Sequence, residues 1–313
     1  MNVQQFVTTE FGSKLWVALG RWLPTSVGHA FARTVSGVLA RRHDTSLYRI
    51  MRANQAGILG PNATPEQLDT AVRAVLGHAG MTAFDLMHIM AQGEDAVLHA
   101  VDFGPDFWAN VELVKATGRG VLICGCHLSN FNLAFLGFAL KGFPTQVLSA
   151  AMPAAGFGMM ADIRNRGVLE ETPISAAALR KAIARMRAGG AAAIGVDWPV
   201  GAGSGEAVPF FGRPAHLATG WARMALSANA VIFPMACRWS PARRYYAISQ
   251  PPMMLEVTGD READVQHNVR RILAVMENWI SETPDQWLMY HRVWPETDGR
   301  LSDSGIKPRM EAP

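Results

Sequence analysis

The sequence is poor in cysteine, in charged residues and in uninterrupted apolar runs. Three cysteines in 313 residues, Cys124, Cys126 and Cys237, are too few for a disulfide framework and favour a reduced, cytosol-facing compartment. Charged residues make up 18% of the chain, against ~25% in an average soluble domain, whereas hydrophobic residues make up 49%. This balance excludes a disordered chain, a coiled coil and an acidic tail protein. It indicates a globular protein, part of whose surface is not in contact with water.

No segment reads as a transmembrane helix. Residues 120–140 contain no Lys, Arg, Asp or Glu and are long enough to span a bilayer, but their centre, 124–130, is polar and contains glycine. We therefore expect a buried strand, a turn and a helix there. Residues 142–161 are also uncharged, and their prolines and glycines exclude a spanning helix. The first twenty residues lack a secretory cleavage pattern, so we expect no secretory signal.

Positive charge is concentrated near the N-terminus. Residues 1–52 contain seven basic and two acidic residues, a net charge of +5, whereas the whole chain carries +3. Trp16 and Trp22 lie in the same segment beside leucines. This combination is typical of a segment that lies on an anionic membrane surface, and an amphipathic helix packed on the core explains it equally well. The two interpretations are compatible. We expect a protein that lies on a membrane surface without crossing it, and no nucleic-acid partner.

The chain divides into a helical part, an alternating part and a short tail. Residues 1–115 read as a helical, membrane-associating region, with a helix start and capping box at Thr64 and Gln67. From 116 to 300 strands and helices alternate, which predicts an α/β fold with a mostly parallel central sheet flanked by helices. We expect a loose tail at 301–313, and one structural domain in all. Predicted strands are 121–124, 146–150, 192–196, 231–236 and 245–249; predicted helices are 131–140, 176–189, 217–228 and a long one that includes 265–279.

His127 is the strongest candidate for a catalytic residue. It follows one predicted strand and precedes a predicted helix, and ligands of α/β folds bind at the carboxyl ends of strands. A histidine at this place, with Ser129, Asn130 and Asn132 beside it, can act as a general base. Taken alone, a hydrogen-bonded structural histidine is the competing interpretation.

Four blocks of sequence resemble one family in their order and spacing. The run 120–132, GVLICGCHLSNFN, resembles the H-x4-D/E block of the lysophospholipid acyltransferase superfamily. More narrowly, it is similar to the H-x-G-N-W-E version in the late lipid A acyltransferases, the lauroyl and myristoyl transferases. Asp197-Trp198 with VPFFGRPA at 208–215 resembles the family's D-Q … V-x-F-F-G-x-P-A block, and AVIFP at 230–234 its late strand. Residues 277–294 are similar to the ending E-x-W-I-x-x-x-P-x-Q-W-x-W-x-H-x-R-W.

The resemblance implies a reaction and a location. A fatty acyl group is expected to pass from an acyl carrier protein or coenzyme A thioester to a hydroxyl of a membrane lipid, a lipid A-type glycolipid or a related one. The thioester is then a co-substrate, and neither a cofactor nor a metal is expected. The protein is expected to be peripheral, on the cytoplasmic face of the inner membrane.

The resemblance also implies roles for single residues. His127 is expected to be the base that takes the proton of the acceptor hydroxyl. Arg164 and Arg166 match an arginine-bearing family segment and are expected to hold phosphate or carboxylate groups, with solvated surface arginines as the alternative. Asp197, at a strand end, is expected to bind the acceptor or to orient a neighbour, with a turn aspartate as the alternative. Ser129 and Asn130 complete the expected substrate-binding set.

Asn132 departs from the family pattern, which has Glu or Asp at this position. Its amide oxygen can accept a hydrogen bond from an imidazole N–H, but it carries no charge to stabilise the imidazolium. Three explanations stay open. Asn132 is a tolerated variant in a specialised transferase, or a neighbouring carboxylate, first of all Asp197, takes over the role, or the protein is a catalytically inactive relative that binds a lipid or an acyl chain. A hydrolase lacks support, because the chain has no G-x-S-x-G motif.

The other candidate sites have weaker support in the sequence. Cys124, Cys126 and His127 look like metal ligands, but no second ligand pair is near, so we predict buried strand cysteines. The basic face of helix 176–189 suits an acidic carrier protein or a membrane, or simply faces solvent. We interpret His291 and Trp294 as structural.

Overall fold

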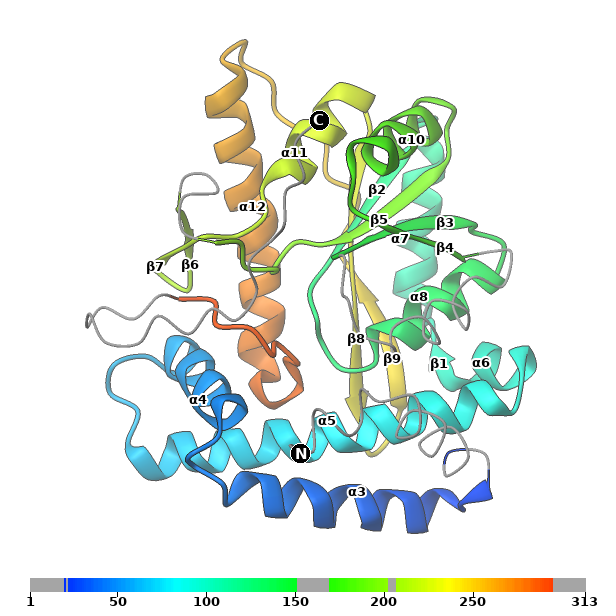
Figure 1. Ribbon diagram of the computed structural model, residues 1–313. Coiled ribbons are helices and arrows are strands. Elements are labelled where there is room, and N and C mark those ends of the chain that lie inside the picture. The colour runs from blue at the N-terminus through cyan, green and yellow to red at the C-terminus, as the bar shows by residue number, and fades with distance from the viewer. Residues whose placement is uncertain (1–19, 21, 151–168, 202–206, 295–313) are drawn as a thin grey trace.

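The computed structural model describes residues 20, 22–150, 169–201 and 207–294. Its N-terminal part is helical, as predicted, and contains α3 (Thr25–Ala40), α4 (Ser46–Leu59), α5 (Pro65–Ala91), α6 (Glu94–Ala100), a two-residue strand β1 (Val101–Asp102) and α7 (Pro105–Ala116) (Figure 1). The capping box is confirmed. The Thr64 hydroxyl accepts from the Gln67 N–H, and the Gln67 side chain accepts from the Thr64 N–H. The predicted tail at 301–313 lies outside the described residues.

A seven-stranded sheet follows, in the order β1-β9-β8-β2-β5-β3-β4. Its further strands are β2 (Val121–Gly125), β3 (Thr145–Ser149), β4 (Leu169–Pro173), β5 (Ala191–Gly195), β8 (Val231–Ser240) and β9 (Arg244–Ser249). The pairs of β2 with β5 and β8, and of β3 with β4 and β5, are parallel, whereas β9 runs antiparallel to β8. The predicted α/β fold with a mostly parallel sheet is confirmed. The helices after β2 are α8 (Phe131–Leu140), α10 (Ala176–Arg187), α11 (Gly220–Ala228) and α12 (Arg261–Glu282), with a short 3-10 turn η1 (Pro284–Gln286) after α12.

Three pieces of β structure were not predicted. One is the two-residue strand β1, which lies within the part of the chain predicted as helical. The strand β4 reads Leu-Glu-Glu-Thr-Pro and lies at the edge of the sheet, where half-exposed polar side chains hide the apolar alternation of a buried strand. The strands β6 (Val208–Phe210) and β7 (Arg213–Ala215) form a hairpin within the quoted 208–215 block. Phe211 and Gly212 connect them with positive φ angles of 52° and 68°, which is the conformation of a tight two-residue hairpin turn.

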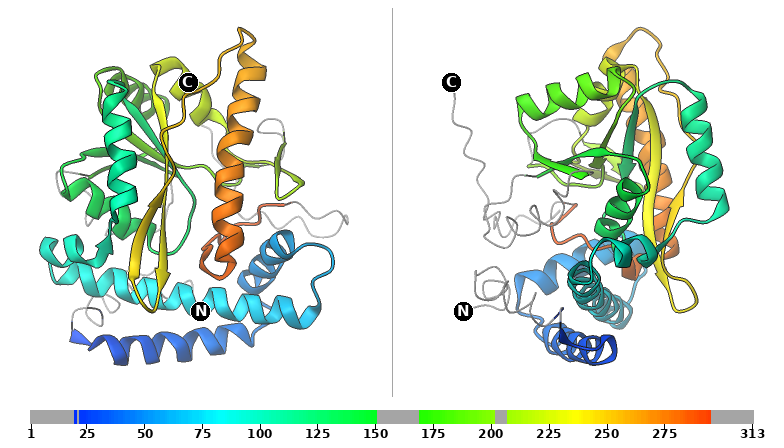
Figure 2. Two further views of the ribbon diagram at one scale, coloured as in Figure 1. Left: turned by 180° about the vertical axis from the view of Figure 1, so that it is seen from behind. Right: turned by 90° about the vertical axis from the view of Figure 1, so that its right-hand side faces the viewer.

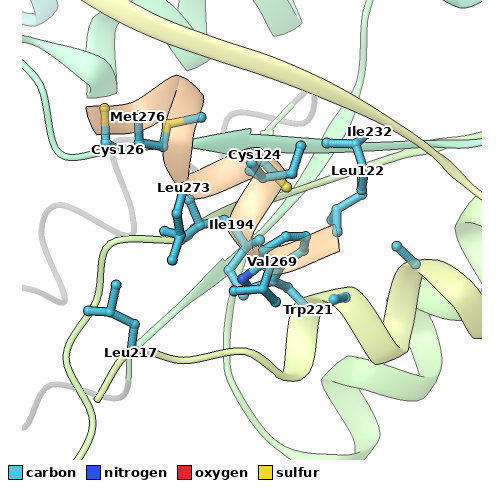
Figure 3. Close-up of a cluster of buried hydrophobic side chains, with 14 of the residues drawn as sticks. Leu122, Cys124, Cys126, Ile194, Leu217, Trp221, Ile232, Val269, Leu273 and Met276 are labelled. Atoms are coloured by element: carbon cyan, nitrogen blue, oxygen red, sulfur yellow. The ribbon is translucent and has the colours of Figure 1, made fainter. Parts of the chain in front are cut away.

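Alternate residues of the central strands belong to two hydrophobic layers, one on each face of the sheet. Because side chains of a strand point alternately to the two faces, neighbours such as Leu122 and Ile123 end up on opposite sides. One layer packs against α10, α11 and α12, and the other against α7 and α8. Figure 3 shows the first layer, where Val269, Leu273 and Met276 of α12 meet Cys124 and Ile194 of the sheet. Cys124 is buried within β2, as predicted, and Cys126 is buried directly after that strand.

The helices α3 and α5 lie side by side at one end of the molecule, with α3 outermost (Figures 1 and 2). The buried face of α3 consists of small residues four apart, Gly28, Ala32, Ser36 and Ala40, which let the two helix backbones approach closely. A Cβ at Gly28 would lie 2.0 Å from the ring of Phe84 on α5. Within the basic segment 1–52, α3 is an amphipathic helix packed on α5, whereas Trp16 lies outside the described residues. Within the described ranges, none of the helices is both long enough and apolar enough to cross a membrane.

One face of α5 buries polar side chains between α3 and the sheet. His78, Thr82 and Asp85 follow each other at helical spacing and all are buried. The Tyr245 hydroxyl donates to Asp85 Oδ2 at 2.6 Å, and His29 Nε2 of α3 lies 2.5 Å from Asp85 Oδ1. Burying such groups without partners would destabilise the fold, so this layer is stable only with its hydrogen bonds in place.

Acid should weaken this layer through His78. Burial lowers the pKa of His78 to about 4, below its ordinary value of 6.5. The unfolded chain therefore binds this proton more tightly, so the stabilisation is complete above about pH 6.5 and is lost as the pH falls towards 4. We expect this group to remove about 2 kcal/mol of unfolding free energy between pH 7 and pH 5.

Urea unfolding of wild type, His78→Leu and His99→Leu at both pH values tests this. His99 is exposed on α6 and serves as the control. The drop between pH 7 and pH 5 should be smaller by about 2 kcal/mol in His78→Leu than in the other two proteins. An equal drop in all three would show that His78 is not the group responsible.

Candidate active site

His127 lies in the turn that connects β2 to α8, at the carboxyl edge of the sheet. The predicted strand, turn and helix are all present there. The side chain of His127 is 20% exposed, and its Nδ1 lies 2.7 Å from Oδ1 of Asp197. Asp197 follows β5, the neighbour of β2, so two residues 70 positions apart in the sequence meet because their strands are parallel.

Asp197 is completely buried behind His127. Its Oδ2 accepts from the backbone N–H of His127 at 2.9 Å and from the indole N–H of Trp287 at 2.8 Å. Burial on its own would raise the pKa of Asp197, but the charge of His127 and these hydrogen bonds outweigh it and hold the pKa below its usual value. Because an ionised carboxylate only accepts hydrogen bonds, Nδ1 of His127 is the donor in this pair.

The register of β2 and β5 sets the position of the imidazole. Gly125 and Gly195 are directly opposite, and the N–H of Val196 donates to the carbonyl of Gly125 at 2.9 Å. A Cβ at Gly195 would lie 2.8 Å from Cε1 of His127, which is closer than carbon atoms pack. Glycine at 195 therefore leaves the space in which the ring stands.

The C-terminal segment, residues 283–294 after α12, packs against the other side of this turn. The N–H of Ser129 donates to the carbonyl of Gln286 at 2.7 Å, and the N–H of Leu288 donates to the carbonyl of His127 at 2.8 Å. Gln286 itself is fixed by two side-chain hydrogen bonds to the backbone of Trp239. Trp287 lies between these contacts and points its indole N–H at Asp197.

Residues of α4 hold the end of this segment. The side-chain amide of Asn54 donates to the carbonyls of Met289 and His291 and accepts from the N–H of Val293. The indole of Trp294 is buried and donates to the carbonyl of Phe210, which confirms the structural interpretation of Trp294.

Aromatic rings surround the imidazole of His127. The ring of Phe131 lies edge-on at 5.0 Å between centroids, and the ring of Trp198 lies at 5.4 Å. His291, which we interpreted as structural, packs on Trp198 at 4.5 Å and so stands in the same neighbourhood. Burial, and then the nearby charge of His127, lower the pKa of His291 below its ordinary value. The imidazole of His127 thus has an apolar, partly desolvated environment.

Ser129 and Asn130 are buried behind the turn, with their side chains facing α5. The hydroxyl of Ser129 is joined to Nε2 of His78 by a hydrogen bond of 3.0 Å, and the amide of Asn130 donates to the carbonyl of Thr82 at 3.1 Å. Ser129 has a φ of +49°, in the left-handed region, which costs a non-glycine residue about 1–2 kcal/mol. These two residues therefore hold the turn against α5.

Asn132 is the second residue of α8 and is half-buried. From the sequence, it was one of the candidates for a catalytic residue that orients His127 in place of the family carboxylate. Among the described residues, however, Asp197 holds Nδ1 of His127, and Asn132 makes no hydrogen bond to that ring. Arg164 and Arg166 lie outside the described residues.

The thiols beside His127 have no exposed reactive surface. Burial raises the pKa of Cys124 and, with the added charge of Asp197, that of Cys126. In the part of the chain that the structure describes, no three His, Cys, Asp or Glu side chains are grouped so that they could hold a metal ion.

The geometry as a whole suits general base catalysis. A histidine with one nitrogen on a buried, ionised carboxylate presents its other nitrogen to a substrate in a fixed tautomer. His127 and Asp197 were predicted from the sequence, whereas no role was predicted for Trp287, Gly195 or Trp198. Trp287 and Trp198 stood in the quoted family blocks, which was the signal available for them, whereas nothing in the sequence marked Gly195.

Comparisons with known proteins bear on the same question. No curated protein matches the chain. A family model described as bacterial lipid A biosynthesis acyltransferase matches residues 3–296, which is most of the chain. The chain therefore belongs to the bacterial lipid A biosynthesis acyltransferase family, and this membership indicates an acyltransferase enzyme.

Proposed function

We propose that this chain transfers a fatty acyl group from an acyl thioester to a hydroxyl of a lipid A-type membrane lipid, with His127 as general base and Asp197 as its partner. The donor thioester belongs to an acyl carrier protein or to coenzyme A. The observation that carries the proposal is the hydrogen-bond chain from Trp287 through the buried carboxylate of Asp197 to His127.

The reaction needs only a proton carrier and a place for developing charge. With Nδ1–H donated to Asp197, Nε2 carries the lone pair and takes the proton of the acceptor hydroxyl. The alkoxide attacks the thioester carbonyl, and the tetrahedral intermediate collapses to an ester. The thiolate then leaves and takes the proton back from the imidazolium. Asp197 stays ionised throughout and stabilises the imidazolium that forms.

The oxyanion of the intermediate must find donors beyond the turn itself. The N–H groups of His127, Leu128 and Ser129 already donate to Asp197, Cys126 and Gln286. Arg164 and Arg166 keep their proposed role of binding phosphate or carboxylate groups of the substrates.

The inactive, lipid-binding alternative rested on Asn132 alone. An asparagine there removes the charge that the family pattern supplies, but Asp197 offers a buried charge to the same imidazole at 2.7 Å. The second of the three explanations for Asn132, a carboxylate from elsewhere in the chain, is therefore the one that we adopt.

We place the protein on the cytoplasmic face of the inner membrane, held there through its N-terminal region. The outer surface of α3 supports this. Val27, Phe31 and Val38 are 43–53% exposed along that helix, and Trp22, just before it, is 78% exposed. Arg33 and Arg41 are exposed on the same helix or directly after it. Exposed apolar and basic side chains together suit a bilayer that contains anionic lipid.

The central prediction is that His127→Ala loses acyl transfer. Removing a general base costs about 10²–10⁴-fold in rate. Transfer of a labelled acyl group from a thioester to a lipid A precursor is measured, with His99→Ala as the matched control on an exposed histidine. Circular dichroism and vesicle binding should be equal in all three proteins. Equal transfer by His127→Ala at equal protein concentration would contradict the proposal.

A second prediction separates Asp197 from Asn132. Asp197→Asn removes the charge that stabilises the imidazolium, so the transfer rate should fall by about 10²-fold or more. Asn132→Glu should bring no increase, because Nδ1 already has its carboxylate. The same transfer assay is used for both, with Asn132→Gln as the uncharged control for side-chain length. A faster Asn132→Glu enzyme, together with an unaffected Asp197→Asn enzyme, would return the role to position 132.

A third prediction concerns the membrane surface of α3. Val27→Asp with Val38→Asp should move the protein out of floating vesicles that contain anionic phospholipid, because two charged groups would have to leave water. Val257→Asp is the control, since Val257 is 69% exposed on a different part of the molecule. Flotation that is the same for all these proteins would show that α3 does not make the contact.

A further inference from the structure

The turn that carries His127 contains a conformation unusual for its residue. Ser129 has a φ of +49°, which glycine adopts freely and serine does not. The H-x-G-N block that this stretch resembles has glycine at the corresponding position, so the chain has placed a serine where the backbone favours glycine. A restraint from elsewhere is needed to keep this conformation fully populated.

His78 of α5 supplies such a restraint. Its Nε2 and the Ser129 hydroxyl form a hydrogen bond of 3.0 Å, and both side chains are buried. The His78 ring is itself confined, edge-on to Trp239 at 6.2 Å between centroids. The two partners are 51 residues apart, so the bond links the long helix α5 directly to the turn at the end of β2.

The conformation of Ser129 decides where the neighbouring groups of the site stand. Its N–H reaches the carbonyl of Gln286, which precedes Trp287, the donor to Asp197. The next residues begin α8 and place the ring of Phe131 edge-on against His127 at 5.0 Å. A change of Ser129 to negative φ would redirect α8 and break the hydrogen bond to Gln286. The imidazole would then lose both the packing of Phe131 and the fixed position of Trp287 and Asp197.

We propose that His78 is a positioning residue for acyl transfer, which holds Ser129 in the left-handed conformation and thereby keeps His127 in its productive orientation. This inference rests on the proposed role of His127 as the base. It assigns His78 no contact with either substrate. Its effect on the reaction passes entirely through the backbone of residue 129.

The test uses the different backbone preferences of alanine and glycine. His78→Leu and Ser129→Ala each remove the hydrogen bond while the left-handed conformation stays costly, so kcat should fall roughly tenfold in each, with KM for the thioester unchanged. Ser129→Gly also removes the bond but needs no restraint, and it should lose less activity than Ser129→Ala. Most sharply, adding Ser129→Gly to His78→Leu should restore most of kcat, whereas adding Ser129→Ala should not.

Several results would overturn the inference. It fails if His78→Leu keeps the full kcat, or if glycine and alanine at position 129 rescue His78→Leu equally. Thermal unfolding is measured on every variant, and His78→Gln, whose amide can still bond to the Ser129 hydroxyl, is included in case His78→Leu does not fold. His78→Gln should keep more of kcat than His78→Leu, and a lower value would contradict the proposal.

The His127→Ala result separates the two proposals. If His127→Ala retains activity, the proposed function fails, and this inference fails with it. If His127→Ala is inactive and glycine gives no rescue, only the role of His78 fails.

Discussion

A carboxylate shielded from water is unfavourable unless hydrogen-bond donors surround it, and the buried charge of Asp197 sets this requirement for the whole site. Three N–H groups meet it: the backbone and the imidazole of His127, from the end of β2, and the indole of Trp287, from the segment after α12. If β2, β5 or the C-terminal segment moved relative to the other two, the carboxylate of Asp197 would lose a donor. The arrangement of β2, β5 and the C-terminal segment is therefore coupled to the same interaction that orients the proposed base.

On the side of the turn that faces α5, a layer of buried polar side chains also holds the turn in place. The side chains of His78 and Asp85 bind Ser129 and Tyr245, and the backbone carbonyl of Thr82 accepts from Asn130, so α5 is hydrogen-bonded to three residues of other elements. Such a layer stabilises less than an apolar one of the same volume, but it accepts only one alignment of its members. Apolar packing on both faces of the sheet supplies the bulk of the stability, and the polar layer supplies the alignment of the turn.

The outer helix α3 connects this interior to the surface. Its small residues at 28, 32, 36 and 40 allow close packing on α5, and its opposite face exposes apolar side chains. His29 of α3 reaches Asp85, the last member of the polar layer. The proposed membrane helix is thus hydrogen-bonded to α5, the same helix that binds the turn carrying His127.

The sequence by itself determined the local elements and singled out His127, the proposed base. The strand, turn and helix around His127, the capping box at Thr64 and the parallel sheet follow from periodicity and from residues that act on their close neighbours. Its four quoted blocks also carried the family assignment. The edge strand β4 escaped prediction because its exposure removes the apolar alternation.

Only the tertiary structure decided which side chain forms the hydrogen bond to Nδ1 of His127. Asn132 is five residues from His127 and resembled the missing carboxylate, whereas Asp197 is 70 residues away and Trp287 a further 90. Sequence distance carries no information about which strands lie side by side or about what space Gly195 leaves for the ring. Those contacts arise from strand order and register, which follow from the packing of the whole sheet and not from any single segment.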